Sequence, residues 1–283
     1  MTGKVMTGEV MDKDVKRVVV ITGASDGIGA EMARQLAARE GAGLALVLAA
    51  RQAAPLQAVA DACVALGAQA LAVPTDVAVQ IQCRRLVIGA VERFGRIDVL
   101  VNNAGRSAHA LFEEVEDLDW YEELMRVNLW GAVWCTQAAL PHLKRSRGSI
   151  VAVSSLAGLI GVPGRTAYSA TKFAMTGFFE ALRAELRGAG VSVTTAYPGV
   201  VATKIRYRGF NAAGETAGAS GLIEEGAMSV EECARLINAG MNRREREVVM
   251  TAKGRFGRFL KLLAPGMVEK MALAALKQDV RPR

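Results

Sequence analysis

Residue types that build several common chemical sites are scarce in this sequence. It has two histidines, His109 and His142, and four widely separated cysteines with no CxxC pair. A serine-hydrolase triad needs a histidine base, and a structural zinc site needs clustered cysteines and histidines. The sequence therefore predicts neither such a triad nor a metal site. Its cysteines are interpreted as buried, unreactive thiols in a reducing cytoplasm.

Long apolar runs are also absent. The longest candidate, GLALVLAA at 43–50, is far shorter than the roughly 20 residues that span a bilayer. Residues 1–14 contain no apolar segment of the kind found in signal peptides, and only seven prolines occur in the chain. We expect a cytoplasmic protein whose residues 1–14 form a flexible tail.

The net charge of +7 is concentrated near the C-terminus. From Met241 onward there are eleven Lys and Arg against four Asp and Glu, whereas residues 1–240 carry 24 of each sign. The basic character therefore belongs to one terminal segment. Nucleic-acid binding by the whole protein is not expected.

Short apolar runs alternate with helical patterns, which predicts an α/β fold: a single Rossmann-type, doubly wound domain with a parallel sheet of about seven strands and helices on both faces. We expect this domain over residues 15–251 and a helical extension over 252–283. The last helix of the domain begins with a capping box, Ser229 and Glu232. The expected strands are 17–25, 43–51, 68–77, 97–105, 148–155, 191–199 and 247–251, and the expected helices are 28–39, 53–66, 78–94, 118–144, 167–188 and 229–237.

A glycine-rich turn, TGASDGIG at 22–29, joins the first strand to the first helix. Glycines allow a sharp turn and a close approach of the backbone to a ligand, and a helix N-terminus attracts a pyrophosphate. The spacing is GxxxGxG rather than GxGxxG. In this position the turn predicts a dinucleotide site.

The end of the second strand bears on the choice between the two nicotinamide cofactors. An acid there would bind the ribose 2′-hydroxyl of NAD, whereas an arginine accommodates the 2′-phosphate of NADP. The sequence has Ala50 followed by Arg51, which favours NADP(H), with NAD(H) as the alternative. A solvated arginine at a strand end is the competing interpretation.

Tyr168 and Lys172 are four residues apart in TAYSATKFAM, residues 166–175. On a helix this spacing places two side chains on one face, about 5–6 Å apart at Cβ. The pair is either an ordinary surface pair or a phenol whose acidity is tuned by the ammonium. A free tyrosine has a pKa of about 10, and a nearby cation favours its ionised form. A tuned phenol could exchange a proton with a substrate near neutral pH.

The glycine-rich turn, NNAG at 102–105 and the Tyr168–Lys172 pair occur in this order. Together they resemble the short-chain dehydrogenase/reductase family over about residues 16–251. The stretch SSLAG…AYSATKFAMTGFF also resembles its 11β-hydroxysteroid dehydrogenase-like branch and related bacterial reductases. The resemblance implies an oxidoreductase that moves a hydride between a nicotinamide cofactor and a carbonyl or secondary alcohol. It also implies a homodimer or homotetramer.

The resemblance further implies four catalytic residues. Tyr168 is the general acid/base and Lys172 its cationic partner. Ser155, thirteen residues before Tyr168, holds the substrate oxygen in preference to Ser154, and Asn128 anchors a proton-relaying water. One departure is Asp26, where members that prefer NADP often carry a basic residue. The positions assigned to the cofactor are Gly23, Ser25, Asp26, Gly27, Ile28, Gly29, Arg51, Asp76, Val77, Asn103, Ala104, Gly105, Tyr168, Lys172, Pro198, Gly199, Val201 and Thr203.

The substrate is expected to be an apolar ketone or alcohol, steroid-like or lipid-like. Residues 204–222 are long enough for a lid. A 3-oxoacyl thioester is the competing substrate, and a non-catalytic NADP-binding sensor is the competing class of function. His109 could line the pocket or lie in a solvent-facing loop, and His142 is expected to be structural. The positions assigned to the substrate are Ser155, Leu159, Tyr168, Tyr207 and Phe210.

The segment 254–277 carries Phe256, Phe259, Leu260 and Leu263 at helical spacing, with basic residues on other faces. A basic amphipathic helix of this kind can lie on an anionic membrane surface. Packing against the protein's own body or against another subunit is the favoured interpretation of this segment.

Overall fold

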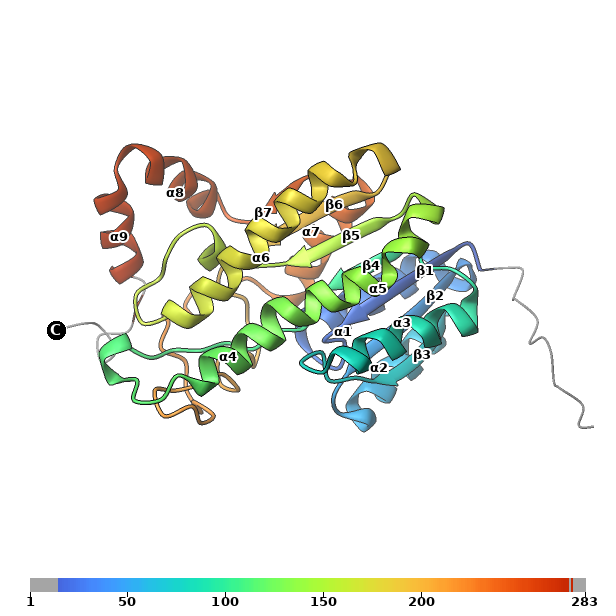
Figure 1. Cartoon of the computed structure of the whole chain (residues 1–283), viewed down its shortest axis with the longest axis horizontal. Helices are drawn as coiled ribbons and strands as arrows, with labels where there is room; N and C mark the ends of the chain where they lie inside the picture. The colour runs from blue at the N-terminus through green and yellow to red at the C-terminus, as the bar shows by residue number, and fades with distance from the viewer. Residues whose placement is uncertain (1–14, 275, 277–283) are drawn as a thin grey trace, which may run out of the picture.

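The computed structural model describes residues 15–274 and 276 (Figure 1). The predicted tail at 1–14 and the end of the predicted extension, residues 275 and 277–283, lie outside the described residues.

A seven-stranded sheet forms the centre of the domain, as predicted, and all its strands are parallel, in the order β3-β2-β1-β4-β5-β6-β7. Each strand is shorter than its apolar run because the last residues of the run form the following turn. The strands are β1 (Arg17–Thr22), β2 (Leu44–Ala50), β3 (Gln69–Pro74), β4 (Val99–Asn102), β5 (Ser149–Val153), β6 (Ser192–Tyr197) and β7 (Glu247–Val249).

Helices cover both faces of this sheet (Figure 1). Alternate strand residues point to opposite faces, so Val19 and Ile21 belong to one core and Val18 and Val20 to the other. Both cores are apolar, which explains the nearly continuous apolar character of the strands. One face carries α1 (Gly27–Glu40), α2 (Ala53–Ala65) and α7 (Val230–Asn242), and the other carries α3 (Gln80–Phe94), α5 (Gly131–Ser146) and α6 (Thr166–Glu185).

The predicted helix over 118–144 is helical but not uniform. It consists of α4 (Asp119–Met125), a π-helical turn over Arg126–Trp130, and α5. Asn128 lies within the π turn and is fully buried. Such a turn inserts one extra residue per helical turn and is frequent at functional sites.

The predicted C-terminal extension is present as α8 (Ala252–Leu263) and α9 (Pro265–Ala274). Figure 1 shows both helices, in red, at the side of the molecule where α6 begins. None of the helices within residues 15–274 is both long and apolar enough to cross a bilayer. Short 3₁₀ turns complete the fold at Gly41–Gly43, Phe112–Glu114, Leu156–Gly158 and Arg187–Ala189.

The capping box predicted for α7 forms only in part. Ser229 Oγ accepts a hydrogen bond from the Glu232 N–H at 3.1 Å, as expected for an N-cap. The Glu232 carboxylate instead accepts two bonds from Arg235, at 2.6 and 2.7 Å.

All four cysteines are buried and free, as predicted. Burial raises the pKa of Cys63 to about 11 and that of Cys233 to about 12, which keeps these thiols protonated and unreactive. The fold also brings together two cysteines that are distant in sequence. A hydrogen bond with Cys83 is the main cause that raises the pKa of Cys135, and burial is the second cause.

Candidate active site

The glycine-rich turn packs directly on the residues that follow β4. A Cβ on Gly23, whose φ is +66°, would lie 2.8 Å from Ala104 Cα. A Cβ on Gly29 would lie 2.5 Å from Asn103 Nδ2, an atom that donates to Thr22 O at 2.9 Å and to Gly23 O at 3.1 Å. Glycine is therefore required at these two positions by the close packing of one chain segment on another.

The turn ends at the N-terminus of α1, a helix of 14 residues. Asp26 is the N-cap residue, and its carboxylate accepts from the Gly27 N–H at 2.8 Å. The same carboxylate forms an exposed ion pair with Arg208, from the segment after β6, at 3.1 Å. Ile28, at the start of α1, and Thr203, in the segment after β6, both line one cavity at the carboxyl ends of the strands.

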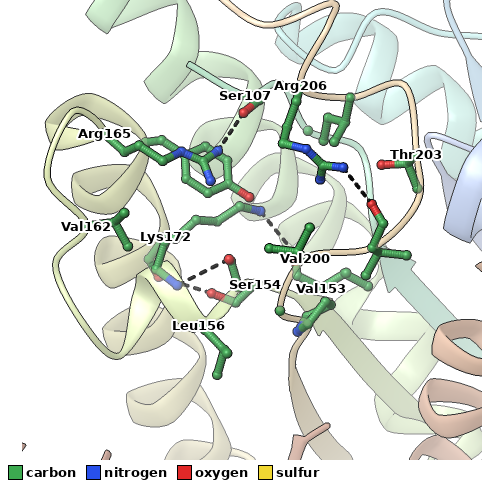
Figure 2. Close-up of a pocket in the computed structure, with 18 of the residues that line it drawn as sticks. Ser107, Val153, Ser154, Leu156, Val162, Arg165, Lys172, Val200, Thr203 and Arg206 are labelled. Carbon is green, nitrogen blue, oxygen red and sulfur yellow. Dashed lines mark hydrogen bonds between the residues drawn. The ribbon is translucent and has the colours of Figure 1, made fainter. Parts of the chain in front are cut away.

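That cavity has a volume of about 250 Å³ and opens at the carboxyl ends of the central strands. Figure 2 shows side chains from the ends of β5 and β6 and from α6 converging on it. The predicted residues that line it are Ile28, Asn103, Gly105, Ser155, Tyr168, Lys172, Pro198, Gly199, Val201 and Thr203. Apolar residues on the substrate side are Leu156, Val162, Ile205, Leu222 and Ala272.

The two serines after β5 face different surroundings. Ser154 is buried, and its hydroxyl donates to the Lys172 carbonyl of α6 at 3.2 Å. Ser155 is less buried and lines the cavity, where its oxygen accepts from the Ala157 N–H at 3.2 Å. The Ser155 proton is therefore available to a ligand, whereas the Ser154 hydroxyl ties β5 to α6.

Tyr168 and Lys172 are both buried, at 7% and 3% exposure, so the surface-pair interpretation does not hold. Lys172 Nζ donates to Val153 O at 3.0 Å and lies 5.7 Å from the centre of the Tyr168 ring. Burial lowers the pKa of Lys172. Tyr168 opposes this change, and the positive charge of Arg165 adds to it.

Asn128 holds the loop after β4 against α6. Its amide nitrogen donates to Arg106 O and to Thr171 Oγ1, both at 3.0 Å, and its oxygen accepts from the Arg106 N–H at 2.8 Å. A Cβ on Gly105 would lie 3.3 Å from Asn128 Oδ1 and 3.7 Å from Lys172 Nζ. The polar ends of Asn128 and Lys172 therefore face the same small region above Gly105.

Three residues assigned to the substrate do not line the cavity. Phe210 is 3% exposed because it packs against Trp120, with ring centroids 5.5 Å apart, and under Arg106. Tyr207 is exposed and donates to Glu224 at 3.2 Å. Leu159 offers its carbonyl to Lys261 of α8. The apolar lining comes from neighbouring positions instead, because the segment 204–222 folds against the loop at 107–110.

The other assigned positions lie around the cofactor side. Arg51 is exposed directly after β2. Burial is the largest cause that lowers the pKa of Arg106, and the positive charge of Arg51 adds to this change. Asp76 accepts from the Ala78 N–H at 2.9 Å, Val77 is buried, and Ser25 is half-buried in the glycine-rich turn.

The two histidines differ in their surroundings. The ring of His109 packs close to Gly164 and Gly221, and His142 contacts Arg145 on α5. No group of three or more His, Cys, Asp or Glu within the described part of the chain is arranged to hold a metal ion.

Sequence reasoning missed two arginines that line the cavity, Arg165 and Arg206. Arg206 is paired with Glu224 at 2.6 Å, and it also donates to Val201 O at 2.9 Å. Arg165 precedes Tyr168 by three residues, a helical spacing that could have indicated contact with it. No local signal distinguishes Arg206 from the exposed arginines near it.

A family model described as short chain dehydrogenase matches residues 17–212. The chain belongs to the short-chain dehydrogenase family. This membership confirms the predicted family and the predicted enzyme class, an oxidoreductase.

Curated relatives of this short-chain dehydrogenase include plant proteins. An 11-beta-hydroxysteroid dehydrogenase A of Sesamum indicum is 39% identical over 269 residues, which cover 93% of this chain and 76% of that protein. An 11-beta-hydroxysteroid dehydrogenase-like 4A of Arabidopsis thaliana is 40% identical over 186 residues. That match covers 65% of this chain but only 61% of the length of the Arabidopsis protein.

Two similar solved structures contain nicotinamide dinucleotides. A short chain dehydrogenase/reductase from Burkholderia phymatum, in complex with NAD, has a TM-score of 0.76 and 25% identity, covering 91% of this chain and 96% of its own. An alcohol dehydrogenase from Thermococcus sibiricus, complexed with 5-hydroxy-NADP, has a TM-score of 0.71 and 27% identity. The match covers 82% of this chain and 94% of that structure's chain. These neighbours support a nicotinamide cofactor without deciding between the two forms.

Proposed function

We propose that this short-chain dehydrogenase interconverts an apolar carbonyl compound and its secondary alcohol, with Tyr168 as general acid/base. The observation that carries the proposal is that Ser155, Tyr168 and Lys172 line one cavity together with Ile28, behind the glycine-rich turn. A bound nicotinamide cofactor would supply or accept the hydride. The protein supplies the proton, the orientation of the substrate and the exclusion of water.

Each polar residue has a distinct part in this proposal. The Ser155 hydroxyl donates to the substrate oxygen and holds it near the Tyr168 phenol, which gives or takes the proton. Lys172, buried beside Tyr168, favours the ionised phenol. Asn128 Oδ1 retains one lone pair and faces the region above Gly105 that Lys172 also faces. A water held there would carry protons between Lys172 and solvent.

For the cofactor we propose NADP(H), with Arg51 binding the 2′-phosphate. Its support is the position of Arg51 directly after β2. Charge-assisted hydrogen bonds contribute about 1.5–3 kcal/mol each. Arg51→Ala should therefore weaken NADPH binding by roughly tenfold to a hundredfold, because about 1.4 kcal/mol corresponds to tenfold. NADH binding, which involves no 2′-phosphate, should change little.

The substrate class rests on the apolar lining of the cavity and on the names of the relatives, 11-beta-hydroxysteroid dehydrogenases. We propose a steroid-like or lipid-like ketone, with a 3-oxoacyl thioester as the second candidate. Two lining residues, Leu222 and Ala272, come from the segment after β6 and from α9. The C-terminal part of the chain would therefore contribute to selectivity.

The deciding experiment follows NADPH absorbance with apolar ketones, quinones and 3-oxoacyl thioesters, with NADH as the cofactor control. Wild-type turnover that falls by about 10²–10⁴-fold in Tyr168→Phe, with unchanged NADPH affinity, would establish the reductase. Tight NADPH binding without turnover of any carbonyl would favour a cofactor-binding sensor. Failure to bind either nucleotide would overturn both proposals.

We also propose that the outer face of α8 and α9 contacts an anionic membrane surface. Phe256, Phe259, Leu262, Leu263 and Met267 are each more than half exposed. The same two helices carry Lys253, Arg255, Arg258, Lys261 and Lys270, and interfacial helices are likewise basic on their polar face. A homodimer or homotetramer, and a cytoplasmic location, stay predictions, and sedimentation velocity and fractionation would test them.

A further inference from the structure

Arg165 places a charge in the protein interior beside the proposed general acid. The residue immediately precedes α6 and is 8% exposed. Its guanidinium carbon lies 4.2 Å from the centre of the Tyr168 ring, so the guanidinium stacks on the ring. Figure 2 shows Arg165 near Lys172, with its guanidinium bonded to Ser107.

The hydrogen bonds of Arg165 do not neutralise its charge. Nε donates to Ala108 O at 3.2 Å, and Nη2 donates to Ser107 Oγ at 2.6 Å. Both acceptors are neutral. Among residues 15–274 and 276, no carboxylate oxygen forms an ion pair with this guanidinium. Burial of an uncompensated charge is costly, so a group that balances it is needed in at least one state of the site.

Tyr168 is the group best placed to provide that balance. Burial lowers the pKa of Arg165, and the negative charge that Tyr168 can carry opposes this change. The face of an aromatic ring attracts a cation, and the attraction grows when the ring carries a negative charge. The guanidinium stacks on the ring itself, whereas the remaining lining nearby is largely apolar.

Other titratable and charged groups around Tyr168 come from four segments of the chain. Lys172 lies on the same helix, and Arg206 arrives from the segment after β6 with Glu224 as its partner. Tyr121 of α4 is hydrogen-bonded to Thr166 at 2.8 Å. The His109 ring packs close to Gly164. Arg206 is already paired with Glu224, so Arg165 and Lys172 are the two cations beside Tyr168 that form no ion pair with a carboxylate of the described residues.

We propose that Arg165 is a second cation that stabilises the ionised form of Tyr168, together with Lys172. The inference rests on the proposed function and deepens it. In ketone reduction the Tyr168 O–H bond breaks, its proton bonds to the substrate oxygen, and the electron pair stays on the phenolate. Arg165 balances that new charge. It acts through Tyr168 and is a positioning residue rather than a catalytic one.

The first test needs no turnover. Ultraviolet difference titration of the full chain measures the phenolate, and subtraction of a matched Tyr168→Phe variant isolates Tyr168 from the other three tyrosines. Arg165→Gln retains hydrogen bonding but removes the charge. It should raise the midpoint of Tyr168 ionisation by about 1–3 pH units, the size expected for a nearby charge. An unchanged midpoint would overturn the proposal.

Matched variants separate charge from structure. Arg165→Lys should keep most of the effect, whereas Ser107→Ala removes one hydrogen bond and should leave the midpoint near that of the wild type. Circular dichroism and NADPH affinity check that each variant folds. If Arg165→Gln does not fold, Arg165→Met repeats the removal of charge with an apolar side chain of similar length.

Kinetics provide a second readout. Alcohol oxidation needs the ionised Tyr168 and ketone reduction needs the protonated form, so each rate changes at the pH where Tyr168 ionises. In Arg165→Gln the midpoints of both pH–rate profiles should move to higher pH, which a general loss of structure would not produce. If the limbs stay in place and only KM for substrates bearing a carboxylate rises, Arg165 binds a substrate anion and the proposal is wrong. Absence of wild-type turnover would count against the proposed function alone, because the titration still decides the role of Arg165.

Discussion

Helix α6 and helix α9 both contribute residues to the lining of the cavity, and α8 packs behind one lining residue, Leu156. Helices α6 and α8 depart from the usual pattern of burial in opposite directions. Helix α6 buries charge: Lys172 is 3% exposed, and Arg165 directly before the helix is 8% exposed. Helix α8 exposes apolar surface: Phe259 is 62% exposed and Leu262 is 80% exposed. Each departure is costly in a folded protein, and both occur around the proposed substrate site.

The two regions tolerate these costs for different reasons. Helix α6 is anchored by large side chains that are fully buried against the sheet, including Phe179 and Met175. Helix α8 has small residues on its inner face, and Gly254 and Gly257 allow it to approach Leu156 and Ile160. The buried apolar side chains of α6 thus offset the cost of its buried charges, whereas α8 packs behind Leu156 and buries little of its own surface.

The largest expected contrast is in stability. Phe179→Ala should lower the free energy of unfolding by about 3–5 kcal/mol, because it removes a fully buried ring from the core. Phe259→Ala, on the exposed face of α8, should change it by no more than about 0.5 kcal/mol. Urea unfolding of both variants measures the difference. Equal effects would mean that the outer face of α8 is covered in solution.

The second prediction concerns the buried charge of α6. Lys172→Met should lower kcat/KM by about 100-fold or more, since it removes the cation beside Tyr168. It should also raise stability at neutral pH by about 1 kcal/mol, because the variant no longer buries an ammonium. Wild-type activity in the variant would contradict the role of Lys172.

The stability gain should also depend on pH in a defined direction. Burial lowers the folded-state pKa of Lys172, so its ammonium destabilises the fold at pH values below that pKa. This penalty disappears as the pH rises from the folded-state pKa to the unfolded value of about 10.4. The advantage of Lys172→Met should therefore shrink over that range, as urea unfolding at several pH values would reveal.

The third prediction tests the exposed apolar face. Replacing both Phe256 and Phe259 by serine should reduce binding to vesicles that contain phosphatidylserine by about tenfold, because interfacial binding scales with buried apolar area. The matched control replaces Ile81 and Ile88 of α3, which are 51% and 53% exposed. Equal losses in both variants would mean that no specific membrane face exists.

The smallest expected effect concerns the start of α8. Thr251 Oγ1 caps this helix by accepting from the Gly254 N–H at 3.0 Å, so Thr251→Ala should cost about 1 kcal/mol. Because α8 buries little of its surface, the loss should appear as faster amide exchange within α8. Ser229→Ala at the cap of α7 should instead lower global stability, since α7 packs on the central core.

Much of the fold could be predicted because its signals are local. Apolar runs of strand length alternate with helical patterns. This alternation was sufficient to predict a parallel sheet of about seven strands with helices on both faces, and the structure has seven. The Tyr168–Lys172 spacing places both side chains on one face of α6, and both line the cavity. The π turn at Asn128 carries no clear local signal, because its neighbours are ordinary helical residues.

The substrate side was harder to predict. Tyr207 and Phe210 lie in a segment with no periodic pattern, and Phe210 became a core residue only because Trp120 and Arg106 surround it. The same limit applies to Cys83 and Cys135, which are distant in sequence yet in contact.

The sequence by itself determined the elements, their order and the chemical types at the strand ends, because helix period, strand period and glycine turns act within a few residues. Tertiary structure decided which charges are balanced. Arg206 finds Glu224, whereas Arg165 finds only neutral acceptors and the Tyr168 ring. Burial and the presence of a counterion depend on segments far apart in the chain, so only the folded molecule could distinguish these two arginines.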